Sequence, residues 1–226
     1  FDKSTSFAIG LSRPCTSRIS WRACWSGLST TIRLSKRPGR SSAGSNTSGL
    51  FVAANNIVGN HETIFSLVRY GNVIGSRGSI YWVLKDAIKN KSNTIPITDK
   101  RMTRFWIELE QCVEFVLSSL DDMRGGEIYV PKIPSMKIID FINNVCPNKK
   151  IVEIGIRPGE KLHEVMITKD DARYTYDCND KYIIEPNIHG WDEKRLEKQK
   201  KDGIKVKENF EYASDINKSW LKKSDL

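Results

Sequence analysis

Short β-rich runs alternate with helix-type segments through most of the chain, and this alternation constrains the fold more than any other feature. The run Phe65–Tyr70 precedes a helical segment at Ile80–Lys89, and an extended stretch at Thr94–Thr98 follows. Two further strands are predicted at Glu127–Val130 and Ile151–Ile156. Strands that alternate with helices are typical of a largely parallel sheet or a small α/β lobe. The sequence therefore predicts an α/β fold.

Apolar periodicity and Gly or Pro residues predict further helices. The most regular one rests on apolar residues at three- and four-residue steps, namely Trp106, Leu109, Val113, Val116, Leu117 and Leu120. Ser135 is expected to cap a helix that runs to Val145, and a short helix is expected after the R-P-G-E run. The range Leu50–Val58 fits the end of a buried helix, and the charged range Trp191–Lys201 predicts a surface helix.

The first 49 residues differ in composition from the rest. Residues 1–50 hold eight Lys or Arg and one acid, whereas the other 176 residues hold 28 basic and 26 acidic groups. Because a nucleic-acid-binding domain spreads its basic face through folded structure, we expect no nucleic-acid partner. The segment is rich in Ser and Arg and lacks periodicity, which fits out-of-frame sequence, a disordered linker or a targeting peptide. The predicted division is a segment at 1–49, disordered or out of frame, and a folded part at 50–226.

The sequence does not favour a membrane protein, a disulfide-stabilised fold or a metal-binding protein. No apolar run approaches the roughly 18 residues of a membrane helix, so we expect no membrane partner. The five cysteines show no C-x-x-C spacing, which is typical of reduced thiols in a cytoplasmic protein. His61 and His189 have no partner at metal-ligand spacing, so no metal site is predicted. His163 is either a structural histidine or a general base.

Four positions carry the candidate chemistry. The glycine-rich stretch Gly71–Gly78 follows a predicted strand, but its G-x-x-x-G-x-x-G spacing differs from the dinucleotide fingerprint. It is therefore either a cofactor loop or a structural or substrate-contacting turn. Arg104 and Arg157 lie at predicted element ends, where guanidinium groups suit bidentate binding of phosphate oxygens, and Glu160 is placed to accept from ribose hydroxyls. The alternative is that each arginine pairs with a nearby carboxylate.

Four long motifs and the tail carry a family resemblance. They read R-Y-G-N-V-I-G-S-R-G-S at 69–79, I-T-D-K-R-M-T-R-F-W-I at 97–107, G-G-E-I-Y-V-P-K-I-P-S-M-K at 125–137, I-G-I-R-P-G-E-K-L-H-E-V-M-I at 154–167 and F-E-Y-A-S-D-I-N-K-S-W-L at 210–221. Together they resemble the inverting UDP-N-acetylglucosamine 4,6-dehydratases, which are extended short-chain dehydrogenase/reductases of the pseudaminic acid pathway. The resemblance runs from Leu50 to the end of the chain.

The resemblance implies a Rossmann-like fold with NADP and a small C-terminal substrate lobe. It implies a reaction that oxidises C4 of the sugar, eliminates water across C5–C6 and returns the hydride to C6 with inversion at C5. Asn72 is implied to lie beside the substrate and Val73 beside the nicotinamide end of the cofactor. Arg104 and Arg157 are implied to hold the UDP phosphates, and Glu160 the uridine ribose. The family also tends to form homo-oligomers.

The sequence departs from the family at the catalytic core. The family's catalytic Asp and Lys positions fall on Thr31 and Ile32, and its Tyr and Lys positions fall on Arg40 and Gly44. These residues supply neither a phenolate base nor an acid for elimination. We therefore expect a partial fold that lacks the N-terminal nucleotide-binding half, and a chain that is inactive as written. The alternatives are a non-catalytic UDP-sugar-binding remnant or a related nucleotide-sugar epimerase.

Overall fold

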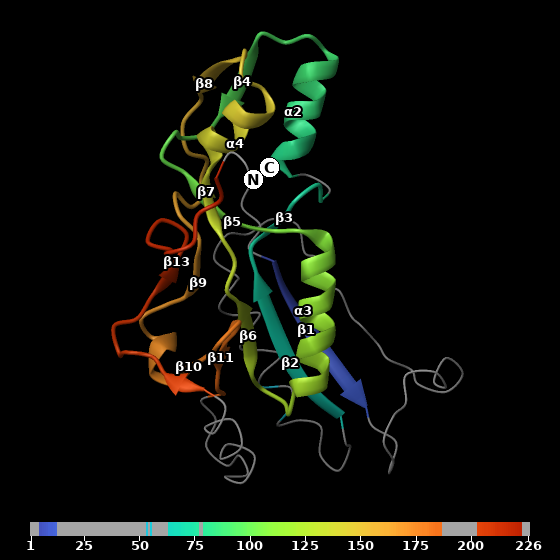
Figure 1. Cartoon of the computed structure of the whole chain (residues 1–226), viewed down its shortest axis with the longest axis vertical. Helices are drawn as coiled ribbons and strands as arrows, with labels where there is room; N and C mark the ends of the chain where they lie inside the picture. The colour runs from blue at the N-terminus through green and yellow to red at the C-terminus, as the bar shows by residue number, and fades with distance from the viewer. Residues whose placement is uncertain are drawn as a thin grey trace, which may run out of the picture.

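The computed structural model of the chain describes residues 5–12, 53, 55, 63–76, 79–186 and 203–222 (Figure 1). Its largest element is a six-stranded sheet in the order β1-β2-β6-β11-β10-β12. At its centre β2 (Thr63–Tyr70) and β6 (Ile128–Pro131) pair in parallel. The remaining strands pair antiparallel: β1 (Thr5–Ser12), β11 (Lys181–Ile184), β10 (Thr175–Cys178) and β12 (Ile204–Lys205). The mixed sheet with flanking helices confirms the predicted α/β class.

One hydrophobic core covers this sheet. The helix α3 (Leu109–Asp122) contacts β2, and the antiparallel pair β9 (Val165–Ile167) and β13 (Tyr212–Ala213) adds residues from the C-terminal part. The fully buried members of the core come from several strands, among them Val68, Phe105, Tyr129 and Ile167. We call the six-stranded sheet, α3, β9, β13 and the short 3-10 helix η1 (Asp171–Tyr174) the body.

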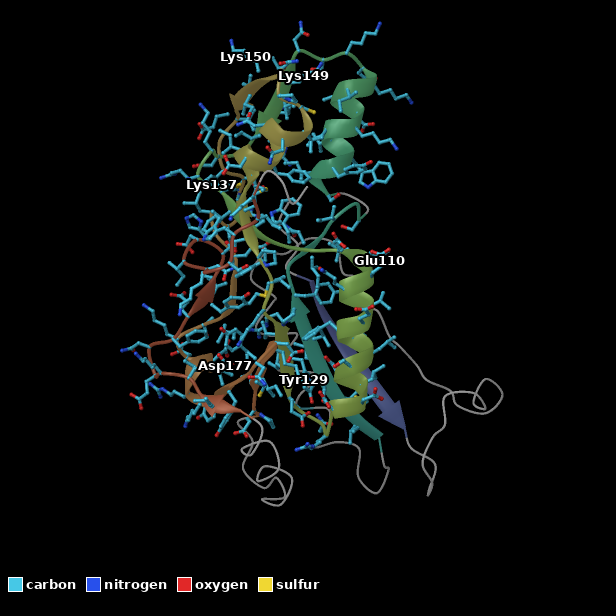
Figure 2. All side chains as sticks on the ribbon, viewed as in Figure 1. Glu110, Tyr129, Lys137, Lys149, Lys150 and Asp177 are labelled. Carbon is cyan, nitrogen blue, oxygen red and sulfur yellow. The ribbon has the colours of Figure 1, made fainter. Side chains whose placement is uncertain are left out.

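A second core lies at the other end of the molecule, at the top of Figure 1. There β4 (Thr94–Ile97) and β8 (Lys150–Glu153) pair in parallel, and the helices α2 (Ile80–Lys89) and α4 (Ile138–Val145) pack against them. Leu84, Ile95 and Ile142 are buried at its centre. We call these four elements the lobe. Figure 2 shows Lys149 and Lys150 at the tip of the lobe, where charged side chains extend into solvent.

A central strand, β5 (Thr103–Ile107), serves both cores. It is the middle strand of a three-stranded sheet, between β3 (Asn72–Val73) and β7 (Ser135–Lys137). All five of its residues are buried. Because side chains alternate along a strand, Phe105 belongs to the body core whereas Trp106 stacks on Phe141 in the lobe core, with ring centroids 4.6 Å apart.

The predicted helix at Ile80–Lys89 and strands near Phe65–Tyr70, Thr94–Thr98 and Glu127–Val130 are confirmed. The predicted helix over 106–120 begins later, at Leu109, because the T-R-F-W-I run that contains Trp106 forms β5. β-branched and aromatic residues favour a strand there, and the helical spacing of Trp106 was coincidental.

Two other predictions were wrong. Ser135 does not cap a helix: it lies in β7, its N–H donates to the Ser219 carbonyl at 2.9 Å, and α4 begins at Ile138. The R-P-G-E run itself contains a turn, and it is followed by a bend at 162–163 rather than a short helix. The strand β1 also lies within the first 49 residues, where the sequence predicted no regular element. The predicted helix at Trp191–Lys201 lies outside the described residues, as does nearly all of Leu50–Val58.

Candidate functional site

The candidate site lies at the carboxyl edge of the lobe sheet. Because β4 and β8 are parallel, the segments that follow them meet at the same edge. Thr98 follows β4, and the Ile154 N–H donates to the Ile97 carbonyl at 2.8 Å, which extends the pairing past β8. The chain then enters residues 157–164, which we call the substrate loop after the role that the family resemblance implies for Arg157 and Glu160. The edge of a parallel sheet is where α/β proteins commonly bind ligands.

A tight turn opens the substrate loop. The Glu160 N–H donates to the Arg157 carbonyl at 3.0 Å, and the Arg157 N–H donates to Glu160 Oε2 at 3.3 Å. Gly159 adopts a positive φ of 83°, which favours glycine. Thr98 Oγ1 donates to Glu160 Oε1 at 3.2 Å and so fixes the turn to the end of β4. Arg157 is exposed, so its side chain can reach an anion in solvent.

Arg104 lies behind the same loop, as the second residue of β5 rather than directly before a helix as the sequence predicted. It is only 2% exposed. One terminal nitrogen donates to the Thr103 and Leu162 carbonyls at 2.8 and 3.1 Å, and the other to the Lys161 carbonyl at 2.9 Å. Its Nε lies 3.6 Å from Glu164 Oε1, which makes a buried ion pair. Phosphate binding by Arg104 stays a prediction.

A polar network lies beside this ion pair. His163 Nδ1 and Thr103 Oγ1 are 2.8 Å apart, and Thr103 Oγ1 is 2.7 Å from Ser214 Oγ. The Glu164 N–H donates to Ser214 Oγ at 2.9 Å, and the Ser214 N–H donates to the Glu164 carbonyl at 2.8 Å. The network joins β5, the substrate loop and the C-terminal segment. Sequence reasoning missed Thr103 and Ser214, because a hydroxyl residue carries no periodic or spacing signal.

Asn72 and Val73 form β3, beside β5. Asn72 is opposite Trp106, whose ring belongs to the lobe core, whereas Val73 packs against the body core. Asn72 therefore lies on the lobe side of this sheet, the side that also carries the substrate loop. The preceding Gly71 is required by close packing, because a Cβ there would lie 2.4 Å from Phe105 Cβ. The Trp82 indole N–H from α2 donates to the Gly75 and Ser76 carbonyls at 3.2 and 3.0 Å, which holds the turn after β3.

An acidic group with a strongly perturbed pKa lies near the site. Asp99 is buried after β4, and it accepts hydrogen bonds from Arg101 Nε at 3.0 Å and from an Arg101 terminal nitrogen at 2.7 Å. These side-chain hydrogen bonds lower the pKa of Asp99 to about 2. Asp99 is therefore ionised at neutral pH, and it serves as a fixed negative charge rather than a proton donor.

Three buried tyrosines among the described residues are unsuited to act as a phenolate base. Burial raises the pKa of Tyr70, Tyr129 and Tyr212, which is opposite to what a phenolate base needs. A Tyr-x-x-x-Lys spacing occurs at Tyr81 and Lys85, which sequence reasoning did not consider. The Lys85 ammonium lies over the Trp82 ring, 4.9 Å from its centroid, which is a cation–π contact.

Several predicted positions lie outside the described residues. These are Thr31, Ile32, Arg40 and Gly44, together with His61 and His189. Within the described ranges, no group of three or more His, Cys, Asp or Glu residues is placed to hold a metal ion. No helix in that part of the chain is long and apolar enough to cross a membrane.

The cofactor implied by the resemblance does not fit the residues present. Extended short-chain dehydrogenase/reductases generally use NAD(P), and the classic Rossmann fold binds the pyrophosphate of such a dinucleotide at a glycine-rich G-x-G-x-x-G turn. That spacing does not occur in the 226 residues. Val73 packs into the body core, and it is the one residue that the resemblance assigns to the cofactor. The described residues therefore supply at most one flank of a dinucleotide site.

Comparisons with known proteins agree with the architecture. Residues 44–186 match the family model described as polysaccharide biosynthesis protein. The chain is 51% identical over 180 residues to a UDP-N-acetylglucosamine 4,6-dehydratase (inverting) from Campylobacter jejuni, which covers 78% of this chain and 54% of that protein. A UDP-glucose 4-epimerase from Rickettsia canadensis is 35% identical over 128 residues, or 55% of this chain and 37% of the epimerase.

A solved structure supports the predicted fold. The X-ray structure of Pen from Bacillus thuringiensis superposes with a TM-score of 0.68 at 30% identity, and it covers 80% of this chain and 54% of that one. This confirms a partial Rossmann-like fold of the extended short-chain dehydrogenase/reductase type. The chain spans about half the length of the dehydratases that it matches. On the family match and these likenesses, the chain belongs to the polysaccharide biosynthesis protein family.

Proposed function

We propose that this chain is the sugar-nucleotide-binding part of a nucleotide-sugar 4,6-dehydratase. The whole protein would convert UDP-N-acetylglucosamine to a UDP-4-keto-6-deoxy sugar with inversion at C5, for polysaccharide or flagellin-glycan biosynthesis. The observation that carries this proposal is the substrate loop, because an exposed Arg157 and a Glu160 fixed by Thr98 lie at the carboxyl edge of the lobe sheet. The 51% identity to a dehydratase of this specificity supports the same assignment.

Each proposed contact has a chemical reason. Arg157 carries a planar guanidinium that matches phosphate oxygens in a bidentate geometry. The Glu160 carboxylate accepts from the two ribose hydroxyls, and its backbone bonds to Arg157 keep the two groups in one turn. Asn72 lies on the lobe side of β3, which supports a contact with the sugar, whereas a contact of Val73 with a cofactor rests on the family resemblance alone. The ligand class that fits such a set is a uridine diphosphate sugar.

Calorimetry with the full 226-residue chain tests the binding. We expect heat on titration with UDP and with UDP-N-acetylglucosamine. Substitution of Arg157 by Met should weaken UDP binding by about tenfold or more, because a hydrogen bond to a charged group contributes about 1.5–3 kcal/mol. Arg173→Met is the matched control, since Arg173 is an exposed arginine of η1 in the body. No heat with either nucleotide would contradict the proposal.

Catalysis by this chain is not expected. The family's catalytic positions carry Thr31, Ile32, Arg40 and Gly44, and the dinucleotide turn is not in the sequence. The second candidate function is therefore a non-catalytic UDP-sugar-binding protein, favoured by a formed substrate loop without the catalytic side chains. Incubation of the chain with UDP-N-acetylglucosamine and NADP should give no 4-keto sugar, and turnover would refute this candidate. Tighter binding of UDP-glucose would favour the related epimerase instead.

We further propose a cytoplasmic protein that associates with copies of itself and has neither membrane nor nucleic acid as a partner. The likeness to nucleotide-sugar enzymes supports this location, because nucleotide sugars are made in the cytoplasm. Light scattering on the purified chain measures the oligomeric state, and a monomer at all concentrations would contradict self-association. Binding of DNA that disappears on deletion of residues 1–49 would contradict the absence of a nucleic-acid partner.

A further inference from the structure

We propose that Arg104 is a positioning residue that holds the substrate loop from behind, rather than a group that touches the phosphates. The inference rests on the proposed function, since it concerns how the same UDP site is built. It differs from the role that the family resemblance implies for Arg104. Three observations carry it: the burial of the guanidinium, the identity of its partners and the second attachment of the loop through Ser214.

All three nitrogens of the Arg104 guanidinium have partners within the protein itself. Its partners are the carbonyls of Thr103, Lys161 and Leu162, the sulfur of Met102 and the carboxylate of Glu164. Three of these belong to the substrate loop. Because guanidinium donors are fixed in one plane, Arg104 cannot turn toward a phosphate without giving up the loop carbonyls. A side chain that is 2% exposed is also shielded from a ligand in solvent.

The substrate loop has a second attachment next to the first. The Glu164 N–H donates to Ser214 Oγ at 2.9 Å, and the Thr103 N–H donates to the Leu162 carbonyl at 3.2 Å. His163 is held through Nδ1 by the Thr103 hydroxyl at 2.8 Å. Every residue from 161 to 164 is thus tied to β5 or to the C-terminal segment. This part of the loop is rigid, and Arg104 is its most connected anchor.

The ligand-facing part of the loop lies directly before this anchored part. Arg157 and Glu160 are bonded to each other, and Thr98 donates to Glu160 from the end of β4. Because residue 160 is followed directly by the anchored residues, the position of both groups also depends on where residues 161–164 are held. Loss of the hydrogen bonds from the Arg104 guanidinium to the loop carbonyls should displace Arg157 and Glu160 together. The loss should therefore weaken UDP binding through these two residues.

Two measurements on the full chain test this role. The first is amide hydrogen exchange of the ligand-free protein, which reports local opening. Arg104→Lys keeps the charge beside Glu164 but loses the planar fork. We expect faster exchange in peptides that span residues 157–164. Arg69→Lys is the matched control, since Arg69 is a largely buried arginine that pairs with Asp171 in the body at 3.2 Å. Unchanged exchange in the loop would overturn the inference.

The second measurement is a mutant cycle on UDP affinity. If Arg104 acts only through Arg157 and Glu160, adding Arg104→Lys to a variant that already carries Arg157→Met and Glu160→Gln should weaken UDP binding by no more than about twofold. A further loss as large as that of Arg104→Lys in the wild-type background would mean an independent phosphate contact by Arg104 and would overturn the inference. Should Arg104→Lys fail to fold, Ser214→Ala removes the second anchor and is expected to give the same two results.

The two proposals fail in different ways. If the wild-type chain gives no heat with UDP, the proposed function is wrong, whereas the exchange experiment still decides whether Arg104 anchors the loop. If the wild type binds UDP but Arg104→Lys leaves amide exchange in residues 157–164 unchanged, or weakens UDP binding just as much when the loop contacts are already removed, the function stands and the positioning role is wrong.

Discussion

The body and the lobe are built in different ways from the same chain. The body sheet is assembled around β2 and β6, and its antiparallel hairpin β10–β11 joins strands that are neighbours in sequence. The lobe joins β4 and β8, which are separated in the chain by β5, α3, β6, β7 and α4. The lobe is therefore not a contiguous domain. Each of its halves is connected through body elements, and β5 passes between the two cores.

This difference explains where the candidate site lies. The body supplies the rigid sheet, and the lobe supplies the edge at which Thr98 and the substrate loop meet. Arg104 and Thr103, at the start of β5, hold that loop against the C-terminal segment. A site at the junction of two cores needs both of them to be folded. We therefore expect the body and the lobe to unfold together.

The largest effect is expected from truncation of neighbouring β5 residues that face different cores. Phe105→Ala removes a ring from the body core and Trp106→Ala removes one from the lobe core. Each should lower the free energy of unfolding by about 3–5 kcal/mol. In urea titrations followed by circular dichroism and fluorescence, both variants should keep a single transition. Separate transitions for the two probes would show that body and lobe fold independently.

The next effect concerns the close contact of β3 with β5. Gly71→Ala places a Cβ 2.6 Å from the Phe105 carbonyl oxygen, so the strands must separate, and we expect a loss of about 1–3 kcal/mol in unfolding free energy. Gly75→Ala is the control, because a Cβ at this position meets nothing within 4 Å. Its only cost is backbone strain at a φ of 74°, which should lower the unfolding free energy by about 1–2 kcal/mol. UDP affinity should fall in Gly71→Ala and stay within twofold in Gly75→Ala. Equal affinity losses would contradict a β3–β5 role in the site.

A smaller effect is expected at the link that Trp82 makes between α2 of the lobe and the turn after β3. Trp82→Phe keeps the ring but removes the donor to the Gly75 and Ser76 carbonyls, so stability should drop by about 0.5–1.5 kcal/mol. Thermal unfolding measures this loss. Tyr81→Phe on the same helix serves as the control, since it is 38% exposed and should change stability by less than about 0.5 kcal/mol. An unchanged midpoint for Trp82→Phe would mean that the turn after β3 does not need α2.

The smallest effect is confined to acid. Because hydrogen bonds from Arg101 lower the pKa of Asp99 from 3.8 to about 2, the folded state binds this proton less readily than the unfolded state. The stabilisation is complete above about pH 4 and is lost as the pH falls toward 2. Between these values Asp99→Asn should show a shallower fall of unfolding free energy than the wild type. Parallel curves would contradict the pairing.

Prediction from the sequence succeeded where the pattern is local. The helix α2 has apolar residues at helical spacing, such as Leu84 and Ala87, and its bounds match the prediction. The motif at 154–167 singled out Arg157 and Glu160, which share one turn, and their contacts with a ligand stay a prediction. Prediction failed at Trp106 and Ser135, where residues that fit a helix pattern lie in strands. Their strands are fixed by partners that are distant in the sequence, and single-sequence patterns do not record such partners.

The sequence by itself determined the α/β class, the family resemblance and the residue types at the site, because each depends on local periodicity or on long contiguous motifs. Only the tertiary structure decided that Arg104 is buried behind the substrate loop and that Thr103, His163 and Ser214 form one network. The physical reason is that burial and hydrogen-bond partners arise from contacts between segments far apart in the chain. The sequence alone does not distinguish an arginine that binds a phosphate in solvent from one that binds three carbonyls in the interior.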